Sequence, residues 1–212
     1  MKMNIFNRTV KEYDRWYEQN RYAYESELAA IKYLLPKGKG LEVGVGTGRF
    51  AVPLGIKYGV EPSENMAMLA RERGVLVKKA VAEKLPFEES TFDFVLFVTT
   101  LCFVGDVQRA LSEAFRVLKK QGAVVIGMLD TSSSFGKIYF EKHKNSKYFK
   151  YSRIVPVKEI IGILKTTGFR KFKIVQTILN KSRKKQGFVT GHGKGLFVAI
   201  KARKTDKGGI AK

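Results

Sequence analysis

Hydrophobic residues along this chain change between a helical period and short, nearly unbroken runs. Residues 8–34 carry aromatic and aliphatic side chains at three- and four-residue spacings with charges between them, which predicts one helix that ends before Pro36 and Gly38. The run 92–98 is almost wholly apolar, as a strand buried on both faces requires. Further strands are predicted from residue 41 and at 56–60, 75–79, 123–129, 169–179 and 196–204, and further helices after residue 48, from Ser63, at 107–118 and at 157–167. This alternation of strands and helices is typical of an α/β protein with seven strands.

Three glycines follow the first predicted strand at every second position. The stretch 41–50 reads L-E-V-G-V-G-T-G-R-F, so that Gly44, Gly46 and Gly48 come after an acid, Glu42. Glycine allows positive φ and lets a ligand approach main-chain N–H groups closely. The G-x-G-x-x-G pattern of dinucleotide-binding proteins would place its third glycine at Arg49, and the G-K-[ST] ending of a P-loop is absent.

The pattern E-x-G-x-G-x-G resembles motif I of the class I S-adenosylmethionine (SAM) dependent methyltransferases. Residues 82–87, A-E-K-L-P-F, and 116–122, R-V-L-K-K-Q-G, resemble two later segments of the same family in the same order. Over about residues 10–205 the chain is similar to the UbiE-like, methyltransferase type 11 group. The resemblance implies one doubly wound, Rossmann-like domain over 1–212 whose seven-stranded sheet is mostly parallel with an antiparallel last strand. It also implies an N-terminal helical cap (1–36), a lid insertion (131–156) and a tail (205–212).

The resemblance further implies SAM as the cofactor and a set of residues that bind it. Glu42 would accept from the methionine amino group, and the glycine backbone would line the methionine and ribose. Glu61 ends the predicted second strand, where ligands of parallel sheets bind, and its carboxylate suits the two ribose hydroxyls. The complete set is Glu42, Gly44, Gly46, Gly48, Glu61, Pro62, Met66, Ala82, Glu83, Val98 and Thr99.

The residues expected at the adenine and at the sulfonium need separate comment. Val81 stands where the family normally carries an Asp that binds the adenine amine, so adenine recognition is expected either to rest on the backbone near Ala82 and on Glu83 or to be looser. Met66, on the following predicted helix, is a candidate for contact with the adenine. Val98 and Thr99 are expected beside the sulfonium.

A general base is required only if the acceptor must lose a proton. Tyr13, Asp130 and His143 are weak candidates, and nothing in the sequence chooses among them. No metal site is expected, because the chain has one cysteine and two histidines. The chain contains no run of about 18 apolar residues, so no membrane span is expected. The N-terminal segment is polar and acidic, unlike a signal peptide, and a cytoplasmic protein is therefore expected.

The positive charge is concentrated in the second half of the chain. Residues 1–106 hold 15 Lys/Arg and 14 Asp/Glu, a net of +1, whereas residues 107–212 hold 25 and 5, a net of +20. An anionic partner such as RNA and a merely solvated basic surface both account for this half. Three functions stay open: methyl transfer to an N, O or C atom of a small molecule, methylation of tRNA or rRNA, and SAM binding without catalysis. The oligomeric state is not indicated.

Overall fold

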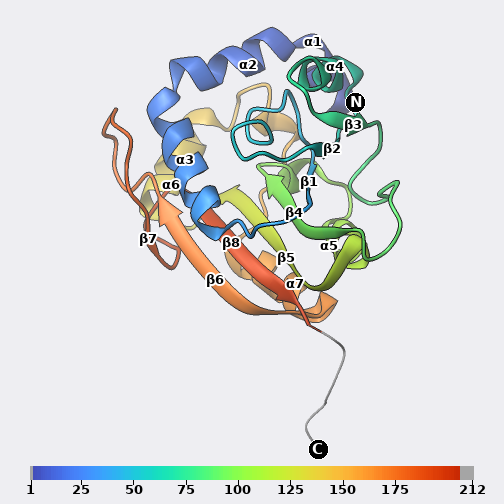
Figure 1. Ribbon diagram of the computed structural model, residues 1–212. Coiled ribbons are helices and arrows are strands. Elements are labelled where there is room, and N and C mark those ends of the chain that lie inside the picture. The colour runs from blue at the N-terminus through green and yellow to red at the C-terminus, as the bar shows by residue number, and fades with distance from the viewer. Residues whose placement is uncertain (1, 206–212) are drawn as a thin grey trace, which may run out of the picture.

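The computed structural model describes residues 2–205, and within them eight strands form one mixed sheet (Figure 1). The order across the sheet is β3-β2-β1-β4-β5-β8-β6-β7. The strands are β1 (Gly40–Val43), β2 (Tyr58–Val60), β3 (Leu76–Lys78), β4 (Phe92–Val98), β5 (Leu118–Leu129), β6 (Phe169–Thr177), β7 (Val189–Thr190) and β8 (Phe197–Lys204). Neighbours from β3 to β5 are parallel, and β8 lies antiparallel between β5 and β6. The predicted mixed sheet with a reversed last strand is therefore confirmed.

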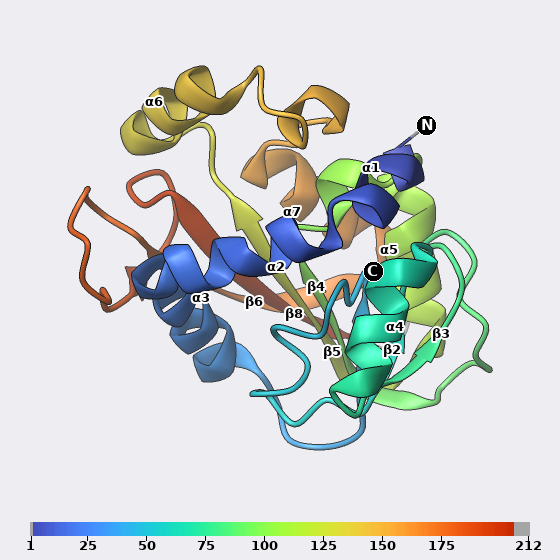
Figure 2. The same ribbon diagram turned by 90° about the horizontal axis from the view of Figure 1, so that it is seen from above.

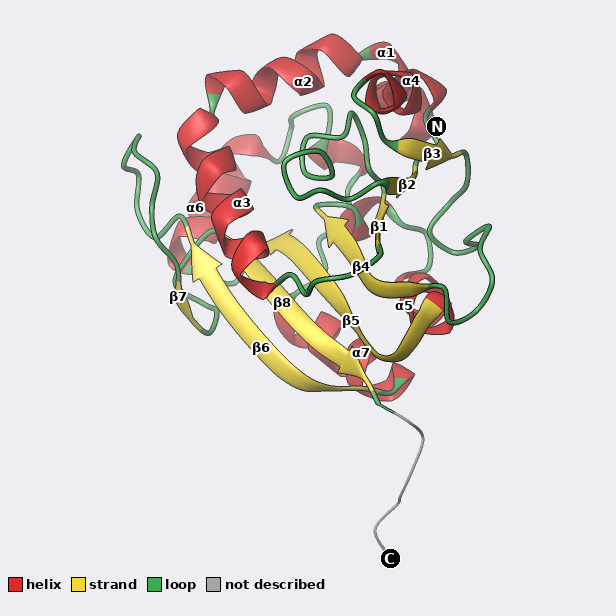
Figure 3. Ribbon diagram, in the orientation of Figure 1, coloured by secondary structure: helices red, strands yellow, loops and turns green. Residues whose placement is uncertain are grey.

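Helices cover both faces of the sheet and the edge where its parallel strands end. The helices are α1 (Lys2–Arg8), α2 (Val10–Gln19), α3 (Arg21–Leu34), α4 (Glu64–Glu72), α5 (Val107–Val117), α6 (Ser134–His143) and α7 (Val157–Thr167), with two short 3₁₀ helices, η1 (Leu101–Phe103) and η2 (Phe149–Tyr151). Helix α3 packs on β5, β6 and β8, while α5 packs on β5 from the other side and α7 on β6 (Figure 3). Seen from above, α1 and α2 cross the carboxyl ends of the parallel strands (Figure 2).

The central strand β4 shows why the sheet needs cover on both sides. Its residues alternate between two apolar clusters: Phe97 packs with Leu111 on the α5 side, and Leu96 packs with Ile31 on the α3 side. All four side chains are completely buried. Because burial stabilises by about 25 cal/mol per Å² of apolar surface, an unbroken apolar run is favoured only in such a doubly covered strand.

The prediction of one continuous N-terminal helix over residues 8–34 is wrong. The structure divides it at Asn20 into α2 and α3, and a separate helix, α1, lies before Thr9. At Asn20 the backbone leaves the helical region (φ −116°, ψ 38°), and its side-chain amide donates to Trp16 O at 3.0 Å. Short polar side chains offer such local hydrogen bonds as an alternative to helix continuation, so an apolar period alone does not detect the break.

The helix predicted after the glycines is absent, and residues 49–55 form turns instead. Gly55 has φ +70°, and Pro53 lacks an N–H, so this segment cannot continue a helix. Strand β5 begins at Leu118, where the end of a helix was expected, and the two-residue β7 was not predicted. Helix α6 forms within the segment 131–156. Most of the predicted tail, residues 206–212, lies outside the described part of the chain.

Candidate active site

The three-glycine loop follows β1 and turns beneath α2. Gly44 and Gly46 have φ of +70° and +55°, a region that side chains with a Cβ rarely adopt. The N–H groups of Gly44 and Val45 both donate to Val60 O, at 2.8 and 3.0 Å, which joins the loop to the end of β2. A Cβ on Gly44 would lie 2.4 Å from the Thr100 side chain. Both the backbone conformation and the close approach therefore require glycine at position 44.

Glu42 lies in β1 with an incompletely satisfied carboxylate. The residue is 2 % exposed, and its buried Oε2 atom has no hydrogen-bond partner among the described residues. Burial raises the pKa of Glu42 well above its usual value; a hydrogen bond from the Ala51 backbone N–H opposes the rise, and the charge of Glu61 adds to it. A buried oxygen without a partner is costly, and such an atom is typical of a position that a ligand completes.

Glu61 lies directly after β2 and is held over the same loop. Its Oε2 accepts from the Gly46 N–H and its Oε1 from the Ser63 N–H, each at 2.9 Å. Burial raises the pKa of Glu61, although both N–H groups act in the opposite direction. Each carboxylate oxygen has two lone pairs, so one remains on each oxygen for a further donor. The sequence predicted a strand-end acid here, and the structure gives it a fixed orientation.

Asp14 attaches the N-terminal cap to the glycine loop. Its carboxylate accepts from Thr47 Oγ1 at 2.7 Å, from Arg49 Nε at 2.8 Å and from Arg73 Nη1 and Nη2 at 2.8 and 2.7 Å. Burial acts to raise the pKa of Asp14, but the hydrogen bonds from Arg73 and Arg49 outweigh it and hold the pKa far below its usual range. Sequence reasoning missed this residue because one acid on an amphipathic helix is normally a solvated one.

Two tyrosines of α2 close the space above the glycine loop. The hydroxyl groups of Tyr13 and Tyr17 are 2.8 Å apart, and a Cβ on Gly46 would lie 3.6 Å from the Tyr13 hydroxyl. Together with Glu42 and Val98 they line a narrow cavity next to the loop. Burial raises the pKa of both tyrosines. Tyr13 therefore keeps its proton near neutral pH, which suits a hydrogen-bond donor better than the general base considered from the sequence.

The segment 131–156 and the loop between β6 and β7 contact the cap. Tyr148 donates to Thr9 Oγ1 at 3.0 Å, and Lys147 forms an ion pair with Glu12. The Gln186 N–H, in the loop between β6 and β7, donates to the side chain of Ser26 on α3 at 2.8 Å. These contacts enclose the carboxyl ends of the strands between the cap and the insertion.

The remaining predicted cofactor residues lie around the same edge, with one clear exception. Met66 is fully buried in α4, Ala82 is 7 % exposed and Val98 ends β4. The carboxylate of Glu83, in contrast, accepts from the N–H groups of Gly105 and Asp106, at 2.8 and 3.3 Å. It therefore connects the loop after β3 to the start of α5. Pro62 lies in the turn before α4, and Thr99, with φ +48°, donates its N–H to Gly127 O at 2.8 Å.

The other two candidate bases, Asp130 and His143, lie in separate environments. Asp130 is 1 % exposed; its Oδ1 accepts from the N–H and hydroxyl of Ser132, and its Oδ2 from the Gly193 N–H at 2.8 Å. His143 ends α6 and packs on Tyr139 with ring centres 4.3 Å apart; burial, with Lys142 second, lowers its pKa. No described hydrogen bond joins Tyr13, Asp130 and His143 to one another, so the structure does not assemble them into one catalytic group.

Comparison with known proteins identifies the family. Residues 41–126 match the methyltransferase domain family. The chain is 48 % identical to a SAM-dependent methyltransferase of Thermotoga maritima, described as a possible histamine N-methyltransferase. The crystal structure of that protein aligns with a TM-score of 0.93 over 97 % of this chain and 100 % of that one. The chain is a SAM-dependent methyltransferase.

A more distant relative with a named activity agrees with this assignment. A demethylmenaquinone methyltransferase of Staphylococcus aureus is 32 % identical over 171 residues, covering 72 % of this chain and 68 % of that enzyme. A protein of Methanocaldococcus jannaschii is 45 % identical over 204 residues, covering 95 % of this chain and all of that protein. The resemblance drawn from the glycine motif is thus confirmed, and the methyltransferase uses SAM as its cofactor. Within residues 2–205 no helix of the methyltransferase has the length and apolar character of a membrane span.

Proposed function

We propose that this methyltransferase transfers a methyl group to an N, O or C atom of a small-molecule acceptor, and that the whole chain serves as one catalytic domain. The observation that carries the cofactor site is the unpaired, buried Oε2 of Glu42 beside the glycine loop. A cationic amino group placed there would satisfy that oxygen and would lower the pKa of the carboxylate to its charged form. Because Gly44 and Gly46 have no Cβ atom, a ligand can approach the backbone of the glycine loop closely.

Glu61 is proposed to hold the ribose of SAM through the lone pairs that its two backbone donors leave unused. Val98 and Thr99 are proposed to lie beside the sulfonium, and Met66, Pro62 and Ala82 near the adenosine. Bound SAM supplies a methyl group that is already activated. The protein then has to align the acceptor with it and exclude water, and such positioning accounts for a large part of the rate. Glu83 is engaged with the loop before α5 and is the weakest member of the proposed set.

The enclosure of the strand ends favours a small acceptor. The cap, the insertion and the β6–β7 loop are joined by hydrogen bonds and an ion pair, so the space near the glycine loop is surrounded on several sides. A nucleotide of a folded RNA would need this enclosure to open. The Thermotoga protein, described as a possible histamine N-methyltransferase, makes small amines reasonable first acceptors to test.

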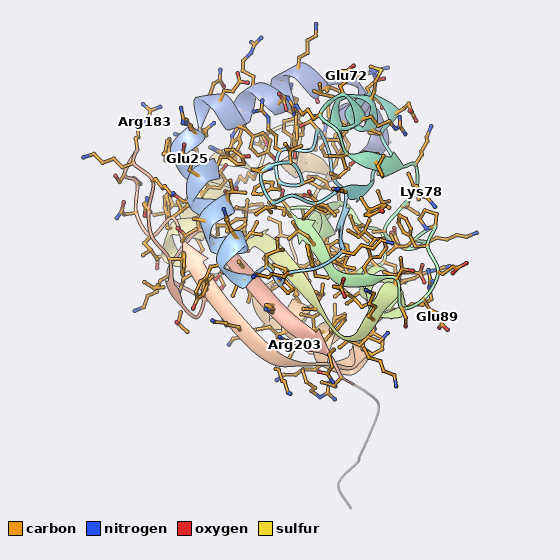
Figure 4. The ribbon with its side chains drawn as sticks, in the orientation of Figure 1. Glu25, Glu72, Lys78, Glu89, Arg183 and Arg203 are labelled. Carbon is orange, nitrogen blue, oxygen red and sulfur yellow. The ribbon has the colours of Figure 1, made fainter. Side chains whose placement is uncertain are left out.

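RNA remains the second candidate acceptor because two lysines lie opposite each other on paired strands of the sheet. Lys173 on β6 lies directly opposite Lys201 on β8, and Arg203 and Lys173 both lower the pKa of Lys201, after burial. Two like charges on paired strands destabilise a sheet unless an anion lies against them. Figure 4 shows Arg183, on the β6–β7 loop, across the view from Glu72 and Glu89.

The deciding experiment incubates the purified protein with methyl-labelled SAM and a cell extract separated into RNA, protein and small-molecule fractions. Label in the small-molecule fraction supports the proposal. Label in RNA, with activity that falls steeply between about 50 and 200 mM salt because phosphate contacts release counterions, supports the second candidate and overturns the first. A preparation that binds no SAM would remove the proposed cofactor site altogether.

A further inference from the structure

A buried carboxylate on α3 takes no part in the cofactor site. Glu27 is 5 % exposed and lies on the helix face that also carries Ala23, Ala30 and Ile31, which pack into the core. No hydrogen bond or ion pair connects its carboxylate to another residue in the described range 2–205. Burial alone raises the pKa of Glu27 to about 8. A largely buried acid without a partner destabilises the fold, so its presence on this helix face points to a ligand.

Tyr17 of α2 and Tyr139 of α6 belong to the same hydrophobic cluster as Ala23, Ala30 and Ile31, the α3 residues on the helix face of Glu27. Burial raises the pKa of Tyr139 on α6 to about 12, with the charge of Glu27 second and Tyr22 third. Burial raises the pKa of Tyr17 on α2, and Tyr13 and then the charge of Glu27 raise it further. The faces of tyrosine rings attract organic cations, and they do so more strongly where water is excluded. Carboxylate and rings together have the composition of a site for an ammonium group.

Glu27 lies next to the contact between α3 and the β6–β7 loop. Ser26, the residue before Glu27, accepts the hydrogen bond from Gln186 that joins α3 to the loop before β7, and α6 is part of the insertion 131–156. The chain has 40 Lys and Arg residues, yet none of those described forms an ion pair with Glu27. When it is ionised, Glu27 therefore places an uncompensated negative charge inside a strongly basic protein, and a cation is the ligand that this charge favours.

We propose that Glu27 binds a positively charged amine of the acceptor, with Tyr17 and Tyr139 against its carbon skeleton, so that the substrates are small organic ammonium compounds. This inference rests on the proposed function and names the acceptor class for the same site. Glu27 is an anchoring residue: it holds the cation and determines which acceptors enter, whereas the methyl group is transferred beside the glycine loop.

The test measures binding of matched ligands to protein loaded with S-adenosylhomocysteine. The probes are 2-phenylethylamine, histamine and hexylamine, with 2-phenylethanol and hexanol as neutral counterparts, in isothermal titration calorimetry at about pH 8.5 with wild type, Glu27→Gln and Glu25→Gln. Glu25 is two residues away on the same helix, and its pair with Arg21 at 2.6 Å is on the solvent side (Figure 4). It therefore controls for a general loss of negative charge.

We expect at least one amine to bind wild type more tightly than its alcohol, and Glu27→Gln to weaken that amine about tenfold or more while the alcohols are unchanged. Glu25→Gln should bind all probes as wild type does. A merely structural Glu27 would not change the preference of amine over alcohol. Equal binding of amines by wild type and Glu27→Gln, or no preference for any amine in wild type, overturns the inference. Retained S-adenosylhomocysteine binding in those cases leaves the proposed function standing, whereas its absence in wild type contradicts the proposed function itself.

Discussion

Replacement of Asp14 by asparagine tests whether the cap is attached to the glycine loop by one carboxylate. The asparagine side chain would keep the shape of the aspartate but not its charge, and the two guanidinium groups of Arg49 and Arg73 would lose their shared partner. The side chains of Asp14, Arg49 and Arg73 are 13 %, 21 % and 28 % exposed. Breaking a fully buried pair costs about 3–5 kcal/mol, and partial exposure reduces this, so we expect Asp14→Asn to lower the free energy of unfolding by about 2–3 kcal/mol.

Urea unfolding followed by circular dichroism at about pH 7 measures this change, with Glu18→Gln as the matched control. Glu18 also pairs with Arg49, at 2.9 Å, but its side chain is 67 % exposed. The control should therefore lose no more than about 0.5 kcal/mol. For a domain of this size the Asp14 variant should melt about 4–12 °C lower than wild type. A loss below about 1 kcal/mol, or one equal to that of Glu18→Gln, would refute the view that Asp14 is the main attachment of the cap.

The pH dependence of the same variant has a defined sign. The pKa of Asp14 is lower in the folded protein than in the unfolded chain, where it is about 4. Its contribution is therefore complete above the unfolded pKa and decreases as the pH falls below that value. The difference between wild type and Asp14→Asn should be largest near pH 7 and should shrink below about pH 4. A difference that stays constant down to about pH 3 would contradict the assigned charge.

Three further predictions concern the acids and glycines of the site. Gly46→Val should abolish SAM binding in calorimetry, because a branched side chain at φ +55° would strain the loop and point toward Tyr13; retained affinity would disprove the site. Glu61→Ala should weaken SAM binding by about 1.5–3 kcal/mol, and an unchanged dissociation constant would remove its ribose role. Glu27→Gln should make the folded protein more stable than wild type at about pH 8, because an acid with a raised pKa loses stability as the pH rises from its unfolded value of 4.5 through about 8. Parallel stability profiles of the two proteins between about pH 4 and 9 would be inconsistent with a buried, unpaired Glu27.

Several parts of the site could be predicted because local sequence and topology are sufficient for them. The glycine spacing requires a tight loop, and residues at the ends of neighbouring parallel strands meet at one edge, which placed Glu42, Glu61 and Val98 near one another. The continuous apolar run of β4 had to be covered on both faces. These inferences need only the period of the pattern and the direction of parallel strands.

Other parts depend on which distant residues meet. Glu83 was expected to face the cofactor, but its carboxylate finds the N–H groups of Gly105 and Asp106, which are 22 and 23 positions away along the chain. Asp130, a candidate base from the sequence, follows β5, and its carboxylate accepts hydrogen bonds from Ser132 and Gly193. A titratable side chain shows its type in the sequence, whereas its hydrogen-bond partners are determined by loops that pack against it from distant parts of the chain.

The sequence by itself determined the α/β class, the SAM family and the identity of the glycine loop, because each depends on local period and spacing. Only the tertiary structure decided that the cap consists of three helices and that Asp14 is attached to Arg49 and Arg73. It also decided that Glu27 is a buried and unpaired acid rather than a solvated one. The physical reason is that burial and pairing of a charge are properties of its whole surroundings, which side chains from α2, α3 and α6 create together.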